Sequence, residues 1–350
     1  MIELRSDTFT LPTPEMMAAA ASAPLGDDVW GEDPTAIALE EKAARIMGKE
    51  AAVFLSSGSQ GNLAAILSHT KRGDEVIVGE RSHIFNAEAA GAAMVGGVQL
   101  RTVPNTRRGT VDGNALRRAV RPVDIHYPPT TLICVENTQN QCGGAVLAPA
   151  DMAEIRSVAD DAGARVHLDG ARIFNASIAL GIPPATLAET ADSVTFCLSK
   201  GLSAPVGSLL CGSAQFVERA RKYRKMLGGG MRQVGVIAAP GIVALDTMVE
   251  RLADDHANAR KIGIALNQVS GVDVDLDILR TNIVVVDFEG SGRHAVGVVD
   301  ALARHGVLAA PVGKHRIRLV THRGVSSEDV ALAIEILCRE LAGEEVAAAR

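Results

Sequence analysis

Two residues of this 350-residue chain combine a reactive group with an unusual position in the sequence. Lys200 follows the apolar run 193–198 and precedes a glycine. A lysine that is partly desolvated at a strand end has a lowered pKa and can form a Schiff base with an aldehyde. Asp169 follows a short expected strand, 166–168 (Val-His-Leu), at the edge of an open α/β sheet where ligands bind. A carboxylate there could keep a pyridinium nitrogen protonated, which makes that ring an electron sink.

The segment 56–62 is a third candidate, because its small residues separate an apolar run from an apolar helical pattern. Its sequence, Ser-Ser-Gly-Ser-Gln-Gly-Asn, would let backbone N–H groups approach an anion at the positive end of a helix. Taken singly, each candidate also fits an ordinary structural role: a lysine reaching to solvent, a capping aspartate and a tight turn. Taken together, phosphate turn, aspartate and lysine occur in the order typical of pyridoxal phosphate (PLP) enzymes with the aspartate aminotransferase fold.

Short β-branched runs alternate with helical patterns between residues 50 and 250, and these must position the candidates. The expected strands are Ala51–Leu55, Glu75–Val78, Val98–Val103, Thr131–Val135, Val166–Leu168, Ser193–Leu198 and Ser208–Cys211. Several are apolar throughout, as in strands buried on both faces of a mostly parallel sheet. Segments such as Pro149–Ala162 have the periodicity of crossover helices. We therefore expect an α/β large domain over residues 1–250 that binds the cofactor, with the N-terminal segment contributing to the active site.

The pattern changes after residue 250. A charged helix is expected at Arg251–Val269, strands at Ile283–Phe288 and Arg316–Thr321, and a last helix from Ser327 to about Leu341. Residues 251–350 thus form a smaller α+β domain in this interpretation.

Composition narrows the class of function. Hydrophobic residues make up 47% of the chain and the formal net charge is −6 with both signs mixed, so a small-molecule partner is favoured over nucleic acid or a membrane surface. Five cysteines are scattered without CxxC spacing, which argues against a disulfide framework and against a metal site. The first residues do not resemble a signal peptide, and the longest apolar run, 234–245, is too short to span a bilayer. We expect a soluble, cytoplasmic protein.

Several longer motifs resemble the low-specificity L-threonine aldolase and L-allo-threonine aldolase family, whose members have the PLP-dependent aspartate aminotransferase-like fold. They extend from the first residues to the last thirty, in family order. The matching segments are 4–8 (Leu-Arg-Ser-Asp-Thr), 26–34 (Gly-Asp-Asp-Val-Trp-Gly-Glu-Asp-Pro), 168–172 (Leu-Asp-Gly-Ala-Arg), 198–202 (Leu-Ser-Lys-Gly-Leu), 204–208 (Ala-Pro-Val-Gly-Ser), 228–233 (Gly-Gly-Gly-Met-Arg-Gln) and 318–322 (Arg-Leu-Val-Thr-His).

The resemblance implies roles for the cofactor-binding residues. Lys200 would bond covalently to PLP, and Asp169 would pair with the pyridine nitrogen. Gly58 and Ser59 would bind the phosphate, and His83 would stack on the ring. Arg232 would assist with phosphate across a subunit interface.

The resemblance also implies a substrate site. Arg172, which lies against the cofactor as well, and Arg318 would grip the substrate carboxylate together with Ser6; paired guanidinium donors match two oxygens. His126 and Glu88 would lie near the substrate hydroxyl. His83, His126 or a bound water could take the hydroxyl proton, and this choice stays open.

The chain departs from the family pattern at a few positions. Gln139 replaces a usual histidine, and segment 141–144 (Gln-Cys-Gly-Gly) differs from a usual Gly-Lys-Val. Trp30 stands where tyrosine is usual, and Gly61 where serine or alanine is usual. None of these changes removes a catalytic group, but those at Gln139 and 141–144 leave local hydrogen bonding and substrate preference open.

The resemblance implies retro-aldol cleavage of L-threonine, L-allo-threonine and related β-hydroxy-α-amino acids to glycine and an aldehyde. It also implies a homodimer or homotetramer with shared active sites. The alternatives are another PLP lyase, such as a β-eliminating lyase or a phenylserine-preferring aldolase, and a non-catalytic protein that binds a phosphorylated ligand or a partner.

Overall fold

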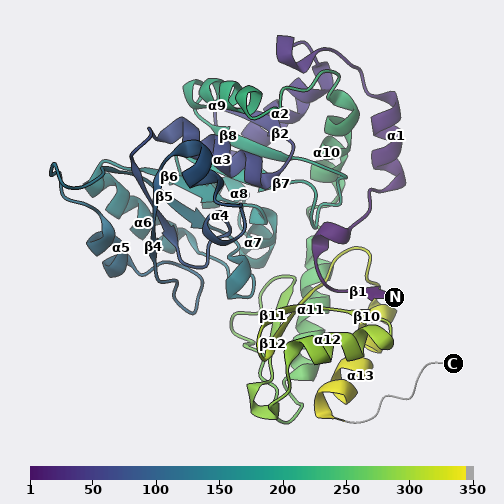
Figure 1. The fold of residues 1–350 in the computed structure, drawn as a ribbon. Coiled ribbons are helices and arrows are strands. Elements are labelled where there is room, and N and C mark those ends of the chain that lie inside the picture. The colour runs from purple at the N-terminus through teal and green to yellow at the C-terminus, as the bar shows by residue number, and fades with distance from the viewer. Residues whose placement is uncertain (344–350) are drawn as a thin grey trace.

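The computed structural model describes residues 1–343, and its largest element is a seven-stranded sheet with the order β2-β8-β7-β6-β5-β3-β4 (Figure 1). Its strands are β2 (Ala51–Leu55), β3 (Glu75–Gly79), β4 (Gln99–Val103), β5 (Thr130–Glu136), β6 (Arg165–Asp169), β7 (Ser193–Cys197) and β8 (Ser208–Gly212). Only β8 runs antiparallel to its neighbours in this sheet. The expected mostly parallel α/β sheet is therefore confirmed, with strand ends shifted by at most one residue.

Both faces of this sheet are buried, which explains why its strands are apolar throughout. In β2, Ala52 and Phe54 join the largest core, whereas Val53 and Leu55 join a second core on the opposite face. Helices that contribute to the largest core are α1 (Pro14–Ser22), α2 (Pro34–Met47), α5 (Gly113–Ala119), α6 (Pro149–Ala162), α7 (Ile173–Leu180), α8 (Pro184–Ala188) and α10 (Gly235–Thr247). Those on the other face are α3 (Gly58–His69), α4 (His83–Asn86) and α9 (Ala214–Met226).

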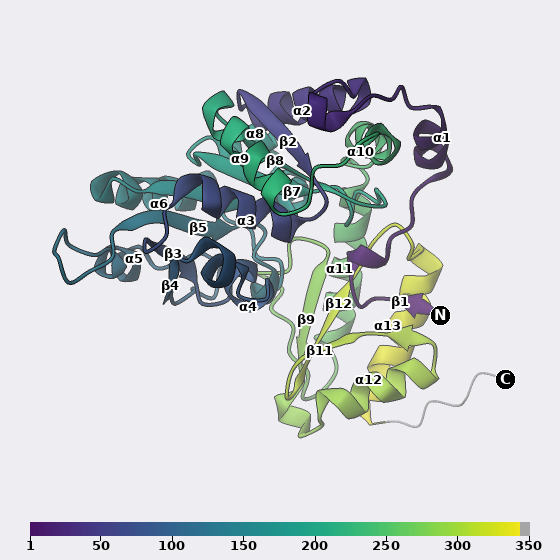
Figure 2. The same ribbon diagram turned by 45° about the horizontal axis from the view of Figure 1, so that its top comes forward.

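A separate core gathers the C-terminal elements and the first residues of the chain. Its antiparallel sheet has the order β11 (Ala310–Gly313), β12 (Arg316–Val320), β9 (Ile283–Asp287). Its helices are α11 (Leu252–Leu266), α12 (Ala295–Arg304) and α13 (Ser327–Ala342). β1 (Ile2–Glu3) pairs in parallel with β10 (Val307–Leu308), so the N-terminus lies beside the C-terminal elements (Figure 2). The α+β character matches the expectation, but the sequence patterns did not reveal β1, β10 or β11.

The carboxyl ends of the parallel strands open on one edge of the large sheet. β2 leads into α3, β3 leads toward His83, β6 ends in Asp169, and β7 ends three residues before Lys200. These positions meet because parallel neighbours end on the same side of a sheet. Within residues 1–343, no helix is long and apolar enough to cross a membrane.

Candidate active site

The sheet edge gathers two carboxyl groups and a histidine around one amide. Asn62 Nδ2 donates to Asp169 Oδ2 and to Glu88 Oε1, each at 2.8 Å. His83 Nδ1 lies 2.8 Å from the same Glu88 oxygen, and the polar atoms of His83, Glu88 and Asp169 all lie within 4.8 Å of one another. The backbone N–H of Ala171 donates to Asp169 Oδ1 at 3.1 Å. The Asp169 carboxylate is therefore held as an acceptor at the end of β6.

The surroundings of His83 and Glu88 shift the pKa values of both groups. The hydrogen bond to Glu88 raises the pKa of His83, whereas burial raises the pKa of Glu88. Both shifts favour the protonated form of each group. Because Nδ1 faces Glu88, the Nε2 atom of His83 is the one left to meet a bound molecule.

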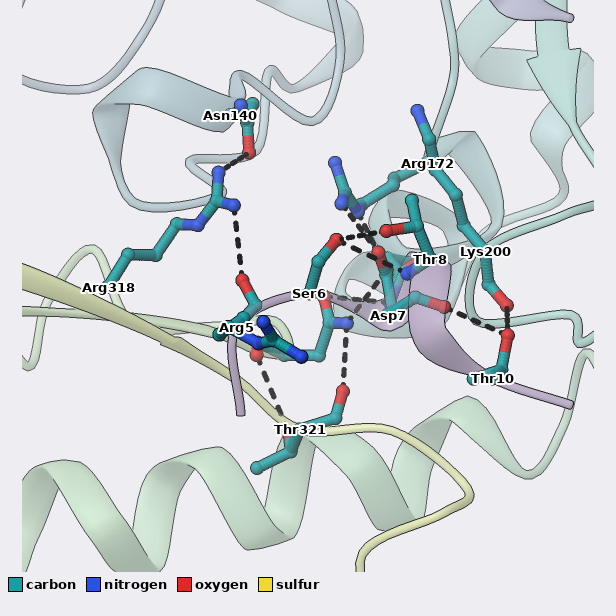
Figure 3. A network of polar contacts seen from close by, with 12 residues as sticks. Arg5, Ser6, Asp7, Thr8, Thr10, Asn140, Arg172, Lys200, Arg318 and Thr321 are labelled. Carbon is teal, nitrogen blue, oxygen red and sulfur yellow. Dashed lines mark hydrogen bonds and ion pairs between the residues drawn. The ribbon is translucent and has the colours of Figure 1, made fainter. Parts of the chain in front are cut away.

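Lys200 lies next to this group. Its carbonyl oxygen accepts a hydrogen bond from Thr10 Oγ1 at 2.8 Å, and its side chain extends away from Thr10 (Figure 3). The Lys200 charge also contributes to the pKa shifts of Asp7 and His83, which places the ammonium group near both. The strand-end lysine and aspartate predicted from sequence thus share one site.

The backbone is strained on either side of this group. Ala89 and Ala90, which follow Glu88 directly, and Ser203, which follows Lys200 by three residues, have left-handed φ angles of 50°, 56° and 64°. Such a conformation costs a residue with a Cβ about 1–2 kcal/mol. Strain of this kind gathers at functional sites, where the surrounding structure sustains it.

The N-terminus of α3 forms a close-packed cradle beside β7. A Cβ atom on Gly58 would lie 2.9 Å from Cys197 Sγ, and one on Gly61 would lie 2.7 Å from Thr195 Cγ2. Ser57 caps the helix by accepting from the N–H of Gln60 at 3.2 Å. The first-turn N–H groups, which have no intrahelical acceptor, include those of Gly58 and Ser59. An anion such as a phosphate fits this end of the helix.

A second group is built around two arginines, Arg172 and Arg318 (Figure 3). Arg172 makes a paired contact with Asp7, with Nε to Oδ2 at 2.8 Å and Nη2 to Oδ1 at 2.6 Å. Both side chains are buried, and Asn282 Nδ2 also donates to Asp7 at 3.1 Å. Although burial opposes ionisation, Arg172 lowers the pKa of Asp7 to about 2. The positive charge of Arg172 is therefore balanced within the protein.

Arg318 forms no ion pair with a carboxylate within residues 1–343. Its Nη1 donates to Asn140 Oδ1 at 3.0 Å and its Nη2 to the Arg5 carbonyl at 3.2 Å, both neutral acceptors. Within the part of the chain that the structure describes, its buried Nε has no hydrogen-bond partner. Burial, and then the charge of Arg172, lower the pKa of Arg318. Ser6 lies alongside and accepts from the N–H of Thr8 at 3.2 Å (Figure 3).

A cavity of about 400 Å³ opens onto Arg318. It is lined by Arg81, Asn140, Gln141, Val285, Val312, Arg316 and Arg318. Since three of these side chains are cationic and none is a carboxylate, the cavity favours a ligand that carries a carboxylate.

Two acids of the site were missed in the sequence. Asp7 stood in a quoted motif without a role, and Glu136 ends β5 just as Asp169 ends β6. Glu136 accepts from the backbone N–H groups of His83 at 2.7 Å and Asn140 at 2.9 Å. Burial, and then Asp169, raise the pKa of Glu136 to about 7. A strand-end carboxylate was the signal that could have identified it. Glu136 therefore connects His83 to Asn140, which in turn accepts from Arg318.

Two predicted residues lie on the surface. His126 is 2.6 Å from Asp124 Oδ1, and Arg232 donates to Asp27 at 2.8 Å. Their side chains are 77% and 59% exposed. Over residues 1–343 of a single chain, neither forms a hydrogen bond or ion pair with another predicted site residue.

The chain is similar to known proteins over most of its length. A model of the beta-eliminating lyase family matches residues 3–289. Low-specificity L-threonine aldolase 1 of Arabidopsis thaliana is 44% identical over 333 residues, which cover 94% of this chain and 93% of that protein. Low specificity L-threonine aldolase of Escherichia coli K12 is 42% identical over 333 residues, 95% of this chain and 96% of that one.

A solved structure supports the fold independently. Leishmania major threonine aldolase matches with a TM-score of 0.81 at 19% identity and covers 98% of this chain and 100% of its own. The family model spans more than half of the chain, and the sequence relatives cover nearly all of it. The chain therefore belongs to the beta-eliminating lyase family, among the low-specificity L-threonine aldolases.

Proposed function

We propose that this protein is a PLP-dependent lyase that cleaves L-threonine, L-allo-threonine and related β-hydroxy-α-amino acids to glycine and an aldehyde. The observation that carries the proposal is the pairing of two groups across one site. Lys200 and the Asp169 carboxylate stand on one side, and Arg318, whose buried Nε lacks a partner within residues 1–343, stands on the other. The names and identities of the relatives point to the same reaction.

The residues of the sheet edge fit PLP. Lys200 would hold the cofactor covalently, and Asp169 would accept from the pyridine N–H because its carboxylate is already fixed as an acceptor. His83 would lie against the ring, and the first-turn N–H groups of Gly58 and Ser59 would bind the phosphate. PLP supplies an electron sink for the bonding electrons of the broken Cα–Cβ bond.

The arginine group would bind and orient the substrate. Arg318 and Arg172, with Ser6, would hold the carboxylate, since the Nε of Arg318 and the N–H groups of Arg172 not used by Asp7 remain to donate. Fixing the carboxylate would set the orientation of the Cα–Cβ bond that is to be cleaved. The charge of Arg318 also favours the anionic group over water in a partly dry site.

A proton must leave the β-hydroxyl as the bond breaks. The His83–Glu88 pair can accept it at Nε2 of His83, since Glu88 then stabilises the charged ring through Nδ1. His126 and a bound water are the other candidates for this step.

We propose a closed homodimer or homotetramer with shared active sites. The loop that carries His126 exposes Val123 and Ile125 almost completely, with relative exposures of 108% and 97%. Burying these side chains against a partner would remove apolar surface from water and would bring His126, and likewise Arg232, to a neighbouring site.

We also propose a large domain at 1–250 and a small domain at 251–350. We propose a cytoplasmic location as well, because a reducing compartment suits five free cysteines.

A product assay tests the proposal. PLP-loaded protein is incubated with L-threonine, L-allo-threonine and phenylserine, and the products are identified. Glycine with the matching aldehyde supports the retro-aldol reaction. Ammonia with a keto acid would favour the β-eliminating alternative, and protein that stays colourless with PLP would contradict both.

A further inference from the structure

A buried chain of polar side chains leads from the site to the far end of α3. Asn62 Oδ1 lies 3.1 Å from His167 Nε2, and His167 Nδ1 lies 2.9 Å from Ser193 Oγ. The same hydroxyl lies 2.8 Å from His69 Nε2. Asn62 and His69 are seven residues apart on α3 and so share a face of the helix. His167 precedes Asp169 by two residues on β6, which points both side chains to the same face of the sheet.

The donors and acceptors in this series of buried side chains have one consistent order. Ionised carboxylates only accept, so the Asn62 amide must turn both N–H bonds to Glu88 and Asp169. Its oxygen therefore faces His167, whose Nε2 must carry a hydrogen. The alternative amide orientation would place the amide oxygen against two carboxylates, which have no hydrogen to donate.

The remaining links follow from the charge state of the histidines. Burial lowers the pKa of His167 to about 4 and that of His69 to about 3, so both rings are neutral near pH 7. A neutral His167 with its hydrogen on Nε2 has a bare Nδ1, which accepts from the Ser193 hydroxyl. The Ser193 oxygen then accepts from His69 Nε2–H. Each hydrogen in this series of hydrogen bonds, from Asn62 to His69, thus points in a defined direction.

This order has a consequence for the site. Asn62 is 1% exposed and His167 is fully buried, so neither can replace a lost partner with water. Oxygens of Asp169 and Glu88 lie within 4.8 Å of each other, and the amide between them supplies a hydrogen to each. If the amide rotated, both carboxylates would lose a donor at once, and Glu88 would hold His83 less firmly.

We propose that Asn62 is a positioning residue that fixes the Asp169 carboxylate and the Glu88–His83 pair in one geometry, and that His167 orients the Asn62 amide with the support of Ser193 and His69. The proposal rests on the proposed PLP function, because Asp169 and His83 act there on the cofactor. None of the four side chains needs to touch PLP or substrate in this role.

Two substitutions at one position test the role of His167. His167→Gln keeps a side-chain N–H toward Asn62, whereas His167→Leu has similar bulk without a donor. We expect His167→Leu to weaken PLP binding about tenfold, because a buried acceptor loses its partner, and to lower kcat while KM for L-threonine stays within about twofold. His167→Gln should restore both quantities to within about threefold of wild type. PLP dissociation constants come from absorbance titration of the cofactor-depleted protein.

Because substitutions at the fully buried His167 could impair folding, a second and less disruptive pair of substitutions tests the same role. Ser193→Ala removes the hydroxyl that fixes Nδ1 of His167, and its matched control Ser68→Ala removes a buried hydroxyl on α3 that bonds only to the Ala64 carbonyl. We expect Ser193→Ala to weaken PLP binding about threefold and Ser68→Ala to leave it unchanged, at comparable thermal stability. Selective ¹⁵N labelling of histidine in the holoenzyme should show His167 neutral with its hydrogen on Nε2 at pH 7.

The outcomes separate the two proposals. Wild-type protein that takes up no PLP would contradict the proposed function. Wild-type protein that binds PLP and cleaves threonine, but whose His167→Leu and His167→Gln forms bind PLP equally well, would overturn the positioning role. A hydrogen on Nδ1 of His167 would overturn it as well, whatever the activity.

Discussion

The two halves of the candidate site are built in different ways. The cofactor half, comprising Lys200, Asp169, Asn62, Glu88 and His83, comes from the carboxyl edge of one sheet and the helix and loop beside it. The carboxylate half, comprising Ser6, Asp7, Arg172, Asn140 and Arg318, combines the N-terminal segment, two loops of the large sheet and β12 of the C-terminal core.

This difference predicts different sensitivities. The positions of the cofactor half follow from one set of parallel strands, so they persist as long as the large sheet persists. The carboxylate half needs two cores to pack correctly against each other, with the first residues of the chain between them. Changes in the first half should act on the chemical step, and changes in the second should act mainly on substrate binding and on stability.

The largest effect is expected at Lys200. Lys200→Ala or Lys200→Arg should abolish turnover while the fold survives, because the arginine side chain stays protonated and cannot bond to the cofactor. Turnover of L-threonine, circular dichroism and borohydride trapping of PLP measure this. Near-normal activity with PLP trapped at another residue would remove Lys200 from the cofactor half.

Asp169→Asn should act on kcat. The carboxamide keeps the shape but weakens the electron sink, which matters only once the Cα–Cβ bond begins to break. We expect a loss in kcat on the order of a thousandfold, comparable to removal of a preorganised electrostatic contact, with KM nearly unchanged. A loss that appeared mainly in KM would contradict the division between the halves.

Arg318→Ala should act first on KM. Loss of a charge-assisted contact to the carboxylate in a partly dry site costs about 2–4 kcal/mol, roughly thirtyfold to a thousandfold in kcat/KM. A smaller loss in kcat should accompany it, because a loosely held carboxylate no longer orients the bond to be cleaved. An unchanged KM would move the carboxylate contact to another residue.

Asp7→Asn should reduce stability as well as binding. It leaves the buried guanidinium of Arg172 without its counter-charge, and breaking a buried pair in this way costs about 3–5 kcal/mol in the free energy of unfolding. Glu3→Gln is the control, since its partner Arg5 is 42% exposed and pairs that reach solvent contribute less than about 1 kcal/mol. Equal losses in the two variants, measured by urea unfolding, would show that Asp7 has no special role.

The smallest effect concerns pH. His167 and His69 have folded pKa values of about 4 and about 3 against 6.5 for an ordinary histidine, so the unfolded chain binds protons that the folded chain does not. Stability is therefore lost as pH falls below 6.5, by about 2 kcal/mol for each histidine by pH 5. Glu136, with its pKa of about 7, has the opposite sign and adds stability as pH falls from 7 to about 4.5.

Urea unfolding at pH 6.5 and pH 5 measures this balance. His167→Gln should lose less stability than wild type over that interval, because glutamine does not titrate. An identical loss in the two proteins would mean that His167 is not buried in its neutral form.

Much of the cofactor half could be predicted from the sequence. Apolar runs of strand length marked β2, β6 and β7, and a lysine, an aspartate or a small-residue turn after each one was enough to place Lys200, Asp169 and Gly58 on one edge. The same rule applied to β5 would have indicated Glu136. Parallel strands impose this placement, because their carboxyl ends must lie on the same side of the sheet.

Contacts between distant segments were settled only by the tertiary structure. Nothing in the local pattern links Asp7 to Arg172, Asn62 to both Asp169 and His167, or β1 to β10. Each of these contacts joins residues more than a hundred positions apart, or crosses between two cores. Local propensity and periodicity describe which residues are buried and which end a strand, but the choice of a buried polar partner depends on how the finished layers pack against each other.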